Sequence, residues 1–487
     1  MTSAPFKSGR DADPPPALLY VAGRWHETTS TKVARDPYTR LGVARVCRAS
    51  PALVDSAVRA AAAEARTMAS MPAHERAALL WRVAGEVKQR TDSLAMSMVA
   101  QTGRPITECR TEVGRAVQAL ELSAEEAKRI SGEVIPLDAV PGDPRRIGFT
   151  LRVPVGVVAA IYPFNAPLVL ACHKLGPALA AGNSVVLKAP FEGALVSQGL
   201  VEAAIAAGVP PGALQLIHGG GGAGEALVGH PMVDLVSFTG GGTTARRILA
   251  TAGLKRTVLE LGGNSATIVH SDANLNRAAD GIVPGAFGLA GQSCGSVQRL
   301  YVHVSVIEPL LELLVARTES LRMGDPRDEA TEIGTLVSES AARRVSTLIK
   351  EAVNRGAKVE SGGRRTGAAL RPTILTGVRP DDRIVCEEVF GPTLAILPYD
   401  DIEGAFHAAN DSPWGLQAGI FTRSLDIAIL AARQIRVGGL NVNGPSRGRT
   451  ELQPFGGVKQ SGWGREGPRY AIQDMTELRM VTLSLAD

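Results

Sequence analysis

The hydrophobic residues of this 487-residue chain follow a helical period at first and then alternate between strand-like and helical runs. Between 53 and 130, apolar positions recur every three or four residues, which predicts helices at 56–68, 73–89 and 112–130. From 155 onward, short apolar runs predict buried strands at 155–161, 184–187, 214–217, 235–238 and 257–261. The stretches between them predict helices at 167–181, 194–207, 224–229 and 243–252. This order favours a parallel sheet covered on both faces.

A second α/β region is expected from 265 to about 441, with helices at 275–289 and 306–321 and strands at 393–397 and 418–421. Two further segments are strand-like: 146–155, after a proline-rich break at 136–144, and 476–485 near the end of the chain. Ribbons with unpaired edges commonly pair with a partner subunit. We therefore expect a homodimer or a homotetramer.

Composition and charge narrow the class of protein. The net charge of +4 comes from 52 basic and 48 acidic residues without a basic block, and it argues against nucleic-acid binding. The first 16 residues lack the apolar core of a signal peptide, and no run approaches the roughly 20 apolar residues of a membrane helix. Five scattered cysteines without a CxxC pair fit neither a disulfide framework nor a zinc site. We expect a cytoplasmic protein with no membrane partner and no bound metal.

Residues with reactive or hydrogen-bonding groups follow the predicted strands where those strands end. Asn165, Lys188, Gly240 and Glu260 each lie at, or just after, the carboxyl end of a strand. Ligands of parallel sheets bind outside these ends, so the four residues are expected to border one cleft. Taken alone, Asn165 also fits a turn between two prolines, Glu260 a solvated strand end, and Lys188 a surface ion pair.

Cys294 is the best candidate nucleophile. It stands in the run GQSCG at 291–295, where glycines permit close approach of substrate or backbone. A thiolate can form a covalent intermediate, and a carboxylate such as Glu260 can activate the water that releases it. The pair indicates two-step covalent chemistry on a carbonyl. The other four cysteines are expected to be small buried hydrophobic residues: Cys47, Cys109, Cys172 and Cys386.

Five ordered motifs resemble those of the aldehyde dehydrogenase superfamily. They are PFNAP at 163–167, ELGG at 260–263, GQSC at 291–294, EEVFGP at 387–392 and PFGGVKQSG at 454–462. Cys294 lies 34 residues after Glu260 (294 − 260), the family's usual separation. The resemblance extends from about Leu18 to the end of the chain. Within the superfamily, the chain resembles the branch of lactaldehyde, phosphonoacetaldehyde and non-phosphorylating glyceraldehyde-phosphate dehydrogenases, partly through the run GREGPRY at 464–470.

This resemblance implies an α/β fold of the aldehyde dehydrogenase type, with a Rossmann-type parallel sheet domain, a second α/β catalytic domain and a small oligomerisation ribbon. The implied dinucleotide-binding domain comprises 17–131 and 155–261, and the catalytic domain comprises 262–441. The ribbon comprises 132–154 and 474–487, the segment 442–473 lines the active site, and 1–16 is a flexible tail.

The implied chemistry is NAD(P)-dependent oxidation of an aldehyde to a carboxylic acid. Cys294 resembles the nucleophile that forms a thiohemiacetal and then a thioester, and Asn165 resembles the oxyanion donor that acts with the Cys294 N–H. Glu260 resembles the general base of thioester hydrolysis; the CoA-acylating branch tends to lack it, so water is the expected acyl acceptor. A CoA-acylating dehydrogenase and a non-catalytic binding or structural protein on the same fold are the alternatives.

The cofactor residues follow from the same resemblance. Lys188 resembles the lysine that bonds the adenosine ribose, Glu388 the carboxylate on the nicotinamide ribose, and Phe390 the adjoining ring. NAD-preferring members carry glutamate where this chain has Phe191, and Glu192 takes that place if the loop shifts by one residue. NAD is predicted, with NADP as the alternative. The remaining predicted contacts lie at two strand ends: Phe238, Thr239, Gly240, Gly241, Thr243 and Leu261.

The substrate is predicted to be a short aldehyde, and the residues leave open whether it is anionic. Arg115 and Arg449 resemble arginines of members that act on phosphono-, phospho- or hydroxy-aldehydes, since a guanidinium suits anionic oxygens. Arg115 also fits a helix surface. Ser293 departs from several anion-specific members, which carry arginine directly before the cysteine. Phe455 and Ser293 complete the predicted substrate contacts.

Overall fold

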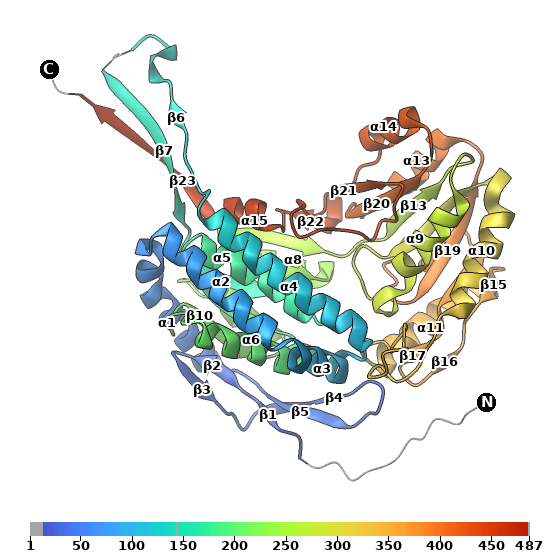
Figure 1. Cartoon of the computed structure of the whole chain (residues 1–487), viewed down its shortest axis with the longest axis horizontal. Coiled ribbons are helices and arrows are strands. Elements are labelled where there is room, and N and C mark those ends of the chain that lie inside the picture. Colours follow the sequence, from blue (N-terminus) through green and yellow to red (C-terminus); the bar gives the residue numbers. More distant parts are fainter. Residues whose placement is uncertain (1–12, 143–144, 486–487) are drawn as a thin grey trace.

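The computed structural model describes residues 13–142 and 145–485, which form an α/β fold with two large sheets (Figure 1). Residues 1–12, most of the predicted tail, lie outside the described residues. The predicted helical region holds four helices, with Gly103 and Pro105 separating the last two: α1 (Pro51–Ser70), α2 (Ala73–Gln89), α3 (Thr91–Thr102) and α4 (Ile106–Ala127). Within the described part of the chain, no helix combines the length and apolar character needed to cross a membrane.

The first sheet contains the five predicted strands in parallel, in the order β12-β11-β8-β9-β10. They are β8 (Val157–Ile161), β9 (Ser184–Ala189), β10 (Leu214–His218), β11 (Leu235–Gly240) and β12 (Arg256–Leu261). The connecting helices are α5 (Pro167–Ala180), α6 (Ala194–Ala206), α7 (Gly221–Gly229) and α8 (Gly242–Ala252). β11 returns to pair with β8 on the side away from β9, so the strand order reverses there. Open α/β sheets bind ligands at such a point.

Short strands that the hydrophobic pattern does not predict extend this sheet at both edges. β2 (Leu19–Val21) pairs antiparallel with β10, β3 (Arg24–His26) pairs with β2, and β22 (Gly462–Trp463) pairs antiparallel with β12. β1 (Pro16–Ala17), β4 (Thr31–Arg35) and β5 (Gly42–Cys47) form a separate sheet, so Pro16 belongs to a strand rather than to the tail. Strands of two or three residues are too short to show an alternating pattern.

The second sheet has the order β15-β18-β19-β14-β13-β20-β21, and all its pairs except β15 with β18 are parallel. Its strands are β13 (Ser265–Val269), β14 (Val297–His303), β15 (Lys358–Ser361), β18 (Thr373–Thr376), β19 (Thr393–Tyr399), β20 (Gln417–Phe421) and β21 (Gly439–Val442). Its helices include α9 (Leu275–Phe287), α10 (Ile307–Ser320), α11 (Glu339–Asn354), α13 (Ile402–Asn410) and α14 (Leu425–Gln434). This region corresponds to the predicted second α/β unit.

A three-stranded arm projects from the body (Figure 1). It joins β6 (Val134–Ile135), β7 (Arg146–Pro154) and β23 (Thr476–Ser484) in the order β23-β7-β6, with β7 and β23 antiparallel along their whole length. The short helix α15 (Pro468–Asp474) leads into β23. The two strand-like segments of the sequence therefore pair with each other.

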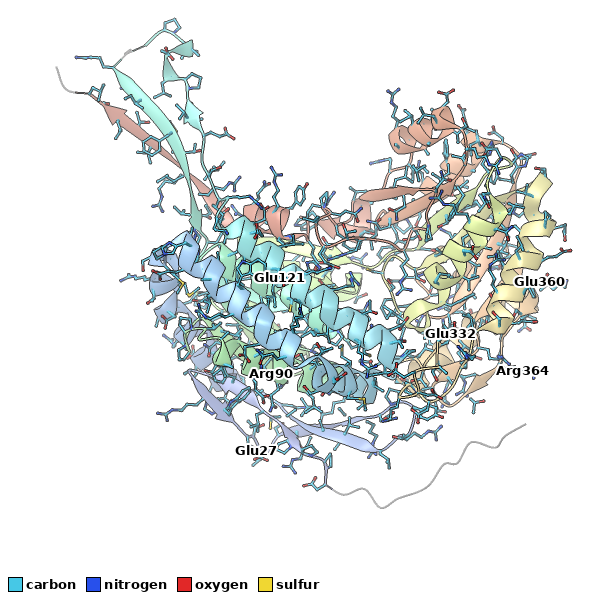
Figure 2. All side chains as sticks on the ribbon, in the orientation of Figure 1. Glu27, Arg90, Glu121, Glu332, Glu360 and Arg364 are labelled. Atoms are coloured by element: carbon cyan, nitrogen blue, oxygen red, sulfur yellow. The ribbon has the colours of Figure 1, made fainter. Side chains whose placement is uncertain are left out.

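Charged side chains such as Glu27, Glu332 and Arg364 are exposed on the outside of the molecule (Figure 2). Cys47, Cys109 and Cys172 are buried, as predicted. The prediction was wrong for Cys386, which is exposed at the end of the short helix α12 (Arg383–Cys386). A four-residue helix has too few positions for burial to be inferred from its pattern.

Candidate active site

A cavity of about 710 Å³ is lined by residues that follow strands of the first sheet and by segments of the second α/β unit. Ser293 lies beside Cys294 in its wall, and Phe390 and Phe455 are also among its lining residues. Most of the predicted site residues line it: Arg115, Asn165, Thr239, Gly240, Gly241, Glu260, Leu261, Ser293, Cys294, Glu388, Phe390, Arg449 and Phe455. Four predicted cofactor residues are not part of this lining: Lys188, Glu192, Phe238 and Thr243.

Adjacent strands of the first sheet position the polar groups of the cavity. Glu260 lies near the end of β12 and is aligned with Thr239 of β11, while Asn165 follows β8. Lys188 lies on the next strand, β9, where it is aligned with Ile161 of β8. Of the four residues expected to border one cleft, Asn165, Gly240 and Glu260 line the cavity, whereas Lys188 does not.

The loop before Cys294 has an unusual backbone. Leu289 and Ala290 have φ angles of 58° and 50°, and Gly291 follows with φ of 70°. A Cβ at Gly291 would collide with the carbonyl of Gly391, so glycine is required there for space as well as for conformation. Successive left-handed residues cost conformational energy and are found mainly where function needs a fixed geometry. Here the three left-handed residues lead into the segment that places Cys294 in the cavity wall.

Burial dominates the electrostatics of the Cys294 thiol. It raises the pKa of Cys294 to about 12, with a smaller contribution in the same direction from Glu388. Arg449 acts in the opposite direction. The sulfur is therefore protonated near neutral pH in the structure described, and its reaction requires loss of that proton.

Two N–H donors belong to residues that line the cavity, Asn165 and Cys294. Asn165 Nδ2 donates one hydrogen bond to the Gln292 carbonyl at 3.0 Å, which fixes the amide and leaves its second N–H free. The Cys294 backbone N–H has no acceptor among the described residues. Donors that are fixed before reaction can stabilise an oxygen that becomes negative during it.

Glu260 is almost fully buried, and its carboxylate lacks hydrogen-bond partners. Neither oxygen accepts a hydrogen bond from any residue that the structure describes. Burial raises the pKa of Glu260 well above its usual value, and the neighbouring Glu466 carboxylate raises it further. A carboxylate with a raised pKa is a stronger base towards water once it has lost its proton.

Groups that could bind a dinucleotide lie in the cavity wall and at the adjoining strand ends. Glu388 is held by the Gly263 N–H at 3.2 Å, and burial raises its pKa to about 7. The Lys188 ammonium makes no hydrogen bond or ion pair with a described residue, and burial lowers its pKa. Gly241 faces open space before α8, and the N–H groups of Gly242 and Thr243 that follow it have no partner among the described residues. These donors and acceptors fit ribose hydroxyls and a pyrophosphate.

The predicted role of Glu192 stays a prediction, and its carboxylate already has a partner within the protein. Its carboxylate forms an ion pair with Lys32 at 3.5 Å. The Phe191 ring lies under the same Lys32, 4.5 Å from Nζ, and under Arg48 at 5.5 Å. The two cations therefore hold the phenylalanine and the glutamate in one cluster at the end of β9.

Phe238 and Thr243 also lie outside the cavity lining, and their predicted cofactor role stays a prediction. Phe238 is only 4% exposed and belongs to the hydrophobic core under the first sheet, so it supports the turn without reaching the cavity. Thr243 is exposed on the first turn of α8. Neither side chain could be placed from a strand-to-helix pattern, because the pattern does not specify side-chain direction.

Comparison with known proteins identifies the family and the fold. The model of the aldehyde dehydrogenase family matches residues 25–481. The chain belongs to the aldehyde dehydrogenase family. It is 46% identical to the 3-sulfolactaldehyde dehydrogenase of Priestia megaterium over 96% of this chain and 98% of the relative.

Two solved structures are similar over nearly the whole chain. Aldehyde dehydrogenase 21 from Physcomitrella patens, in complex with the reaction product succinate, has a TM-score of 0.94 and 35% identity over 97% of this chain and 99% of that one. The NADP-dependent glyceraldehyde-3-phosphate dehydrogenase from Bacillus halodurans, complexed with NADP, has a TM-score of 0.94 and 35% identity over 97% of this chain and 100% of that one. Enzymes of this family use NAD or NADP as the cofactor.

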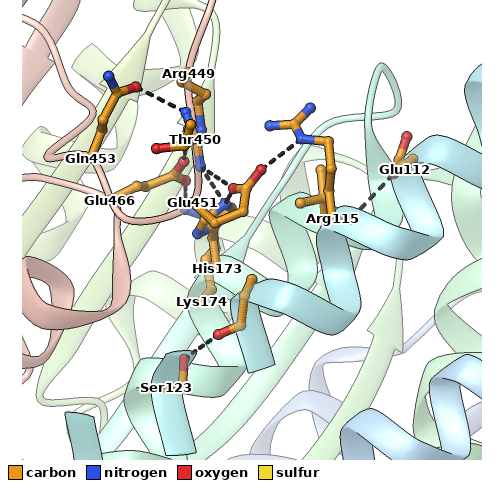
Figure 3. Close-up of polar contacts among 12 residues, drawn as sticks. Glu112, Arg115, Ser123, His173, Lys174, Arg449, Thr450, Glu451, Gln453 and Glu466 are labelled. Carbon is orange, nitrogen blue, oxygen red and sulfur yellow. Dashed lines mark hydrogen bonds and ion pairs between the residues drawn. The ribbon is translucent and has the colours of Figure 1, made fainter. Parts of the chain in front are cut away.

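A network of charged side chains supports one wall of the cavity in this aldehyde dehydrogenase (Figure 3). Arg449 donates to Glu466 at 2.9 Å and to Glu451 at 3.3 Å, and Arg115 Nε donates to Glu451 at 2.6 Å. His173 contacts both Glu451 and Arg449. Burial raises the pKa of Glu466, but the positive charges of Lys174, Arg449 and His173 outweigh it and lower the pKa to about 2.

Several members of this aldehyde dehydrogenase's site were not predicted from its sequence. His173 and Lys174 interrupt an otherwise apolar helix, and that interruption is a signal that a buried polar site is near. Glu451, Glu466 and Arg447 carry no comparable signal, because they lie in loop segments where charged residues are common. Their partners become known only from the fold.

Proposed function

We propose that this aldehyde dehydrogenase oxidises a short aldehyde bearing an anionic group to the carboxylic acid, with NAD as the preferred hydride acceptor. The observation that carries the proposal is that Cys294, Asn165 and Glu260 share one cavity with arginine side chains. The relatives support it by their printed names, because 3-sulfolactaldehyde, succinate and glyceraldehyde 3-phosphate all carry an anionic group.

The first half of the reaction takes place at the Cys294 sulfur. The thiol loses its proton to solvent in the cavity, and the sulfur forms a bond to the aldehyde carbon while the carbonyl π electrons move to oxygen. Asn165 Nδ2 and the Cys294 N–H donate to that oxygen, where losing one such donor typically costs about 100- to 1,000-fold in rate. Glu388 and Phe390 would hold the nicotinamide end of the cofactor, which would supply the hydride acceptor for this carbon, so that a thioester would remain on Cys294.

The second half of the reaction is hydrolysis. Glu260 removes a proton from a water molecule, whose oxygen attacks the thioester carbon, and Cys294 leaves as a thiolate. The carboxylic acid then departs. A carboxylate without a competing hydrogen-bond partner in the described residues suits this step, and it favours water over CoA as the acyl acceptor.

The test follows NAD(P)H absorbance with aldehydes of similar length that differ in charge, namely sulfoacetaldehyde, succinic semialdehyde and propanal. We expect kcat/KM to be at least about 10-fold higher for the anionic aldehydes, as lost charge-assisted hydrogen bonds imply. Equal values for anionic and neutral aldehydes would remove the substrate assignment. Activity that survives stoichiometric alkylation of Cys294 would contradict its role as the nucleophile. NAD(P)H formation that requires CoA and yields acyl-CoA, with no acid formed without CoA, would support the CoA-acylating alternative.

A further inference from the structure

Three arginine side chains line the cavity, and they differ in what balances their charge. They are Arg115, Arg447 and Arg449. Only Arg115 and Arg449 were recognised from the sequence. A guanidinium already paired with carboxylates has little attraction left for an anionic ligand, whereas an unpaired one retains its full charge.

Arg449 is paired with carboxylates through its terminal nitrogens, while its buried Nε has no hydrogen-bond partner among the described residues. Its two terminal nitrogens donate to Glu466 and Glu451, and the guanidinium lies 4.3 Å from the centre of the Phe455 ring. Arg449 is also nearly buried, with only 11% of its side chain exposed. Two carboxylates therefore balance this cation before any substrate enters.

Arg115 is partly engaged. Its Nε donates to Glu451, while 37% of the side chain remains exposed and its terminal nitrogens have no partner among the described residues. Glu451 is shared with Arg449 and His173, so it balances only part of the Arg115 charge. Arg115 lines the cavity, and we call its two unpaired terminal nitrogens the free edge of the guanidinium.

Arg447 has no carboxylate partner within ion-pair distance among the described residues. Its one hydrogen bond is from Nη1 to the Pro284 carbonyl, at 2.7 Å. The backbone of Gly288 approaches so closely that a Cβ there would collide with Nη1, which fixes the position of the guanidinium. A neutral partner fixes the side chain and leaves its charge unbalanced.

The charged groups around Arg447 are mostly too distant or of the wrong sign to neutralise it. Burial is the main cause that lowers its pKa, and Arg104 and Arg115 act in the same direction, while Glu108 and Cys294 oppose them. Glu108 lies beside Arg104, at 3.9 Å, and accepts a hydrogen bond from the Leu289 N–H. An unbalanced cation in a cavity wall is costly unless a ligand supplies the opposite charge.

We infer that Arg447, together with the free edge of Arg115, binds the anionic end group of the substrate, and that Arg449 positions Glu451 and Glu466 instead. The inference rests on the proposed function and specifies how the anion is recognised. The ligand class is an aldehyde with a terminal sulfonate, carboxylate or phosphonate, whose oxygens accept from two guanidinium groups. Ser293, where other anion-specific members carry arginine, is compatible with this arrangement because Arg447 supplies the cation from another loop.

The test compares Arg447→Met with Arg364→Met, an exposed arginine of the second α/β unit. The readout is the ratio of kcat/KM for sulfoacetaldehyde to kcat/KM for propanal. We expect Arg447→Met to lower this ratio about 30-fold, mainly through KM, as loss of a charge-assisted hydrogen bond implies. Arg364→Met leaves the ratio unchanged, and Arg447→Lys restores part of it because charge is kept without the planar fork.

A binding measurement separates recognition from catalysis. Methanesulfonate should slow alkylation of Cys294 by iodoacetamide in the wild-type protein, and this protection should be lost in Arg447→Met. If the wild-type protein prefers anionic aldehydes and Arg447→Met keeps both that preference and the protection, the inference about Arg447 is wrong. If the wild-type protein shows no preference for anionic aldehydes, the proposed substrate class fails first.

Discussion

Glu260 combines deep burial with a carboxylate that accepts no hydrogen bond from a described residue, and this combination determines its acid–base behaviour. Its pKa is raised well above the ordinary value, first by burial and then by Glu466. A raised carboxyl pKa means that the protonated form persists to higher pH, where it cannot accept a proton. We therefore expect the rate of thioester hydrolysis to rise with pH as Glu260 ionises.

The pH dependence can be measured by separating the first turnover from the following ones. At low pH, a burst of NADH followed by slow turnover is expected, because acylation does not need the Glu260 carboxylate and hydrolysis does. The ratio of burst rate to steady rate should fall as pH increases. A ratio that is independent of pH would show that another group activates the water.

Replacing Glu260 with glutamine tests the same role by mutation. Glu260→Gln keeps the volume of the side chain and removes the base, so steady turnover should fall about 100-fold or more while the NADH burst persists. Glu403→Gln, at an exposed position on α13, is the matched control. Loss of the burst as well would assign Glu260 to the acylation half of the reaction.

Asn165 provides a second prediction at the scale of one side chain. Asn165→Ala removes the amide donor and should lower kcat about 100- to 1,000-fold, with a much smaller change in KM, because the oxygen gains charge only during reaction. Asn354→Ala, at the exposed end of α11, is the control. An effect confined to KM would contradict the oxyanion role.

At the scale of elements, the sequence indicates the strands and the residues at their ends but not how loops pack. The runs that become β8, β9, β10, β11 and β12 are apolar and evenly spaced, so their existence and their shared carboxyl edge are predictable. Short edge strands such as β2 and β22 form because a neighbouring strand is already present, and that neighbour is distant in sequence. Burial of Phe238 and pairing of Glu192 with Lys32 likewise depend on tertiary contacts.

The turn after β9 carries a prediction about the cofactor. Glu192 balances Lys32 and adds negative charge beside Phe191, in the turn that follows the strand of Lys188, the residue predicted to bond the adenosine ribose. Glu192→Gln would free Lys32 and reduce repulsion of a 2′-phosphate, so the kcat/KM ratio of NADP to NAD should rise about threefold, the size expected for a partly exposed charge. Glu202→Gln, exposed on α6, is the control, and an unchanged ratio would place the ribose elsewhere.

At the scale of the whole molecule, the arm has an open strand edge and exposed apolar side chains that nothing within the single chain covers. It extends from the body, and β23 is at the edge of its sheet among the described strands. Apolar side chains on the arm are exposed: Ile147, Leu151, Leu478, Met480 and Leu483. Open edges and exposed apolar groups are usually covered by another chain, which supports the predicted homodimer or homotetramer.

A charge placed on the arm tests this assembly. Leu478 is 61% exposed on β23, and Leu478→Glu should prevent its burial against a partner because an unpaired carboxylate would be desolvated there. Light scattering coupled to size-exclusion chromatography should show the wild-type protein as a dimer or tetramer and the variant at a smaller mass. Leu254→Glu, at a fully exposed leucine of the body, is the matched control and should keep the wild-type mass. A wild-type monomer, or a variant with unchanged mass, would contradict the role of the arm in assembly.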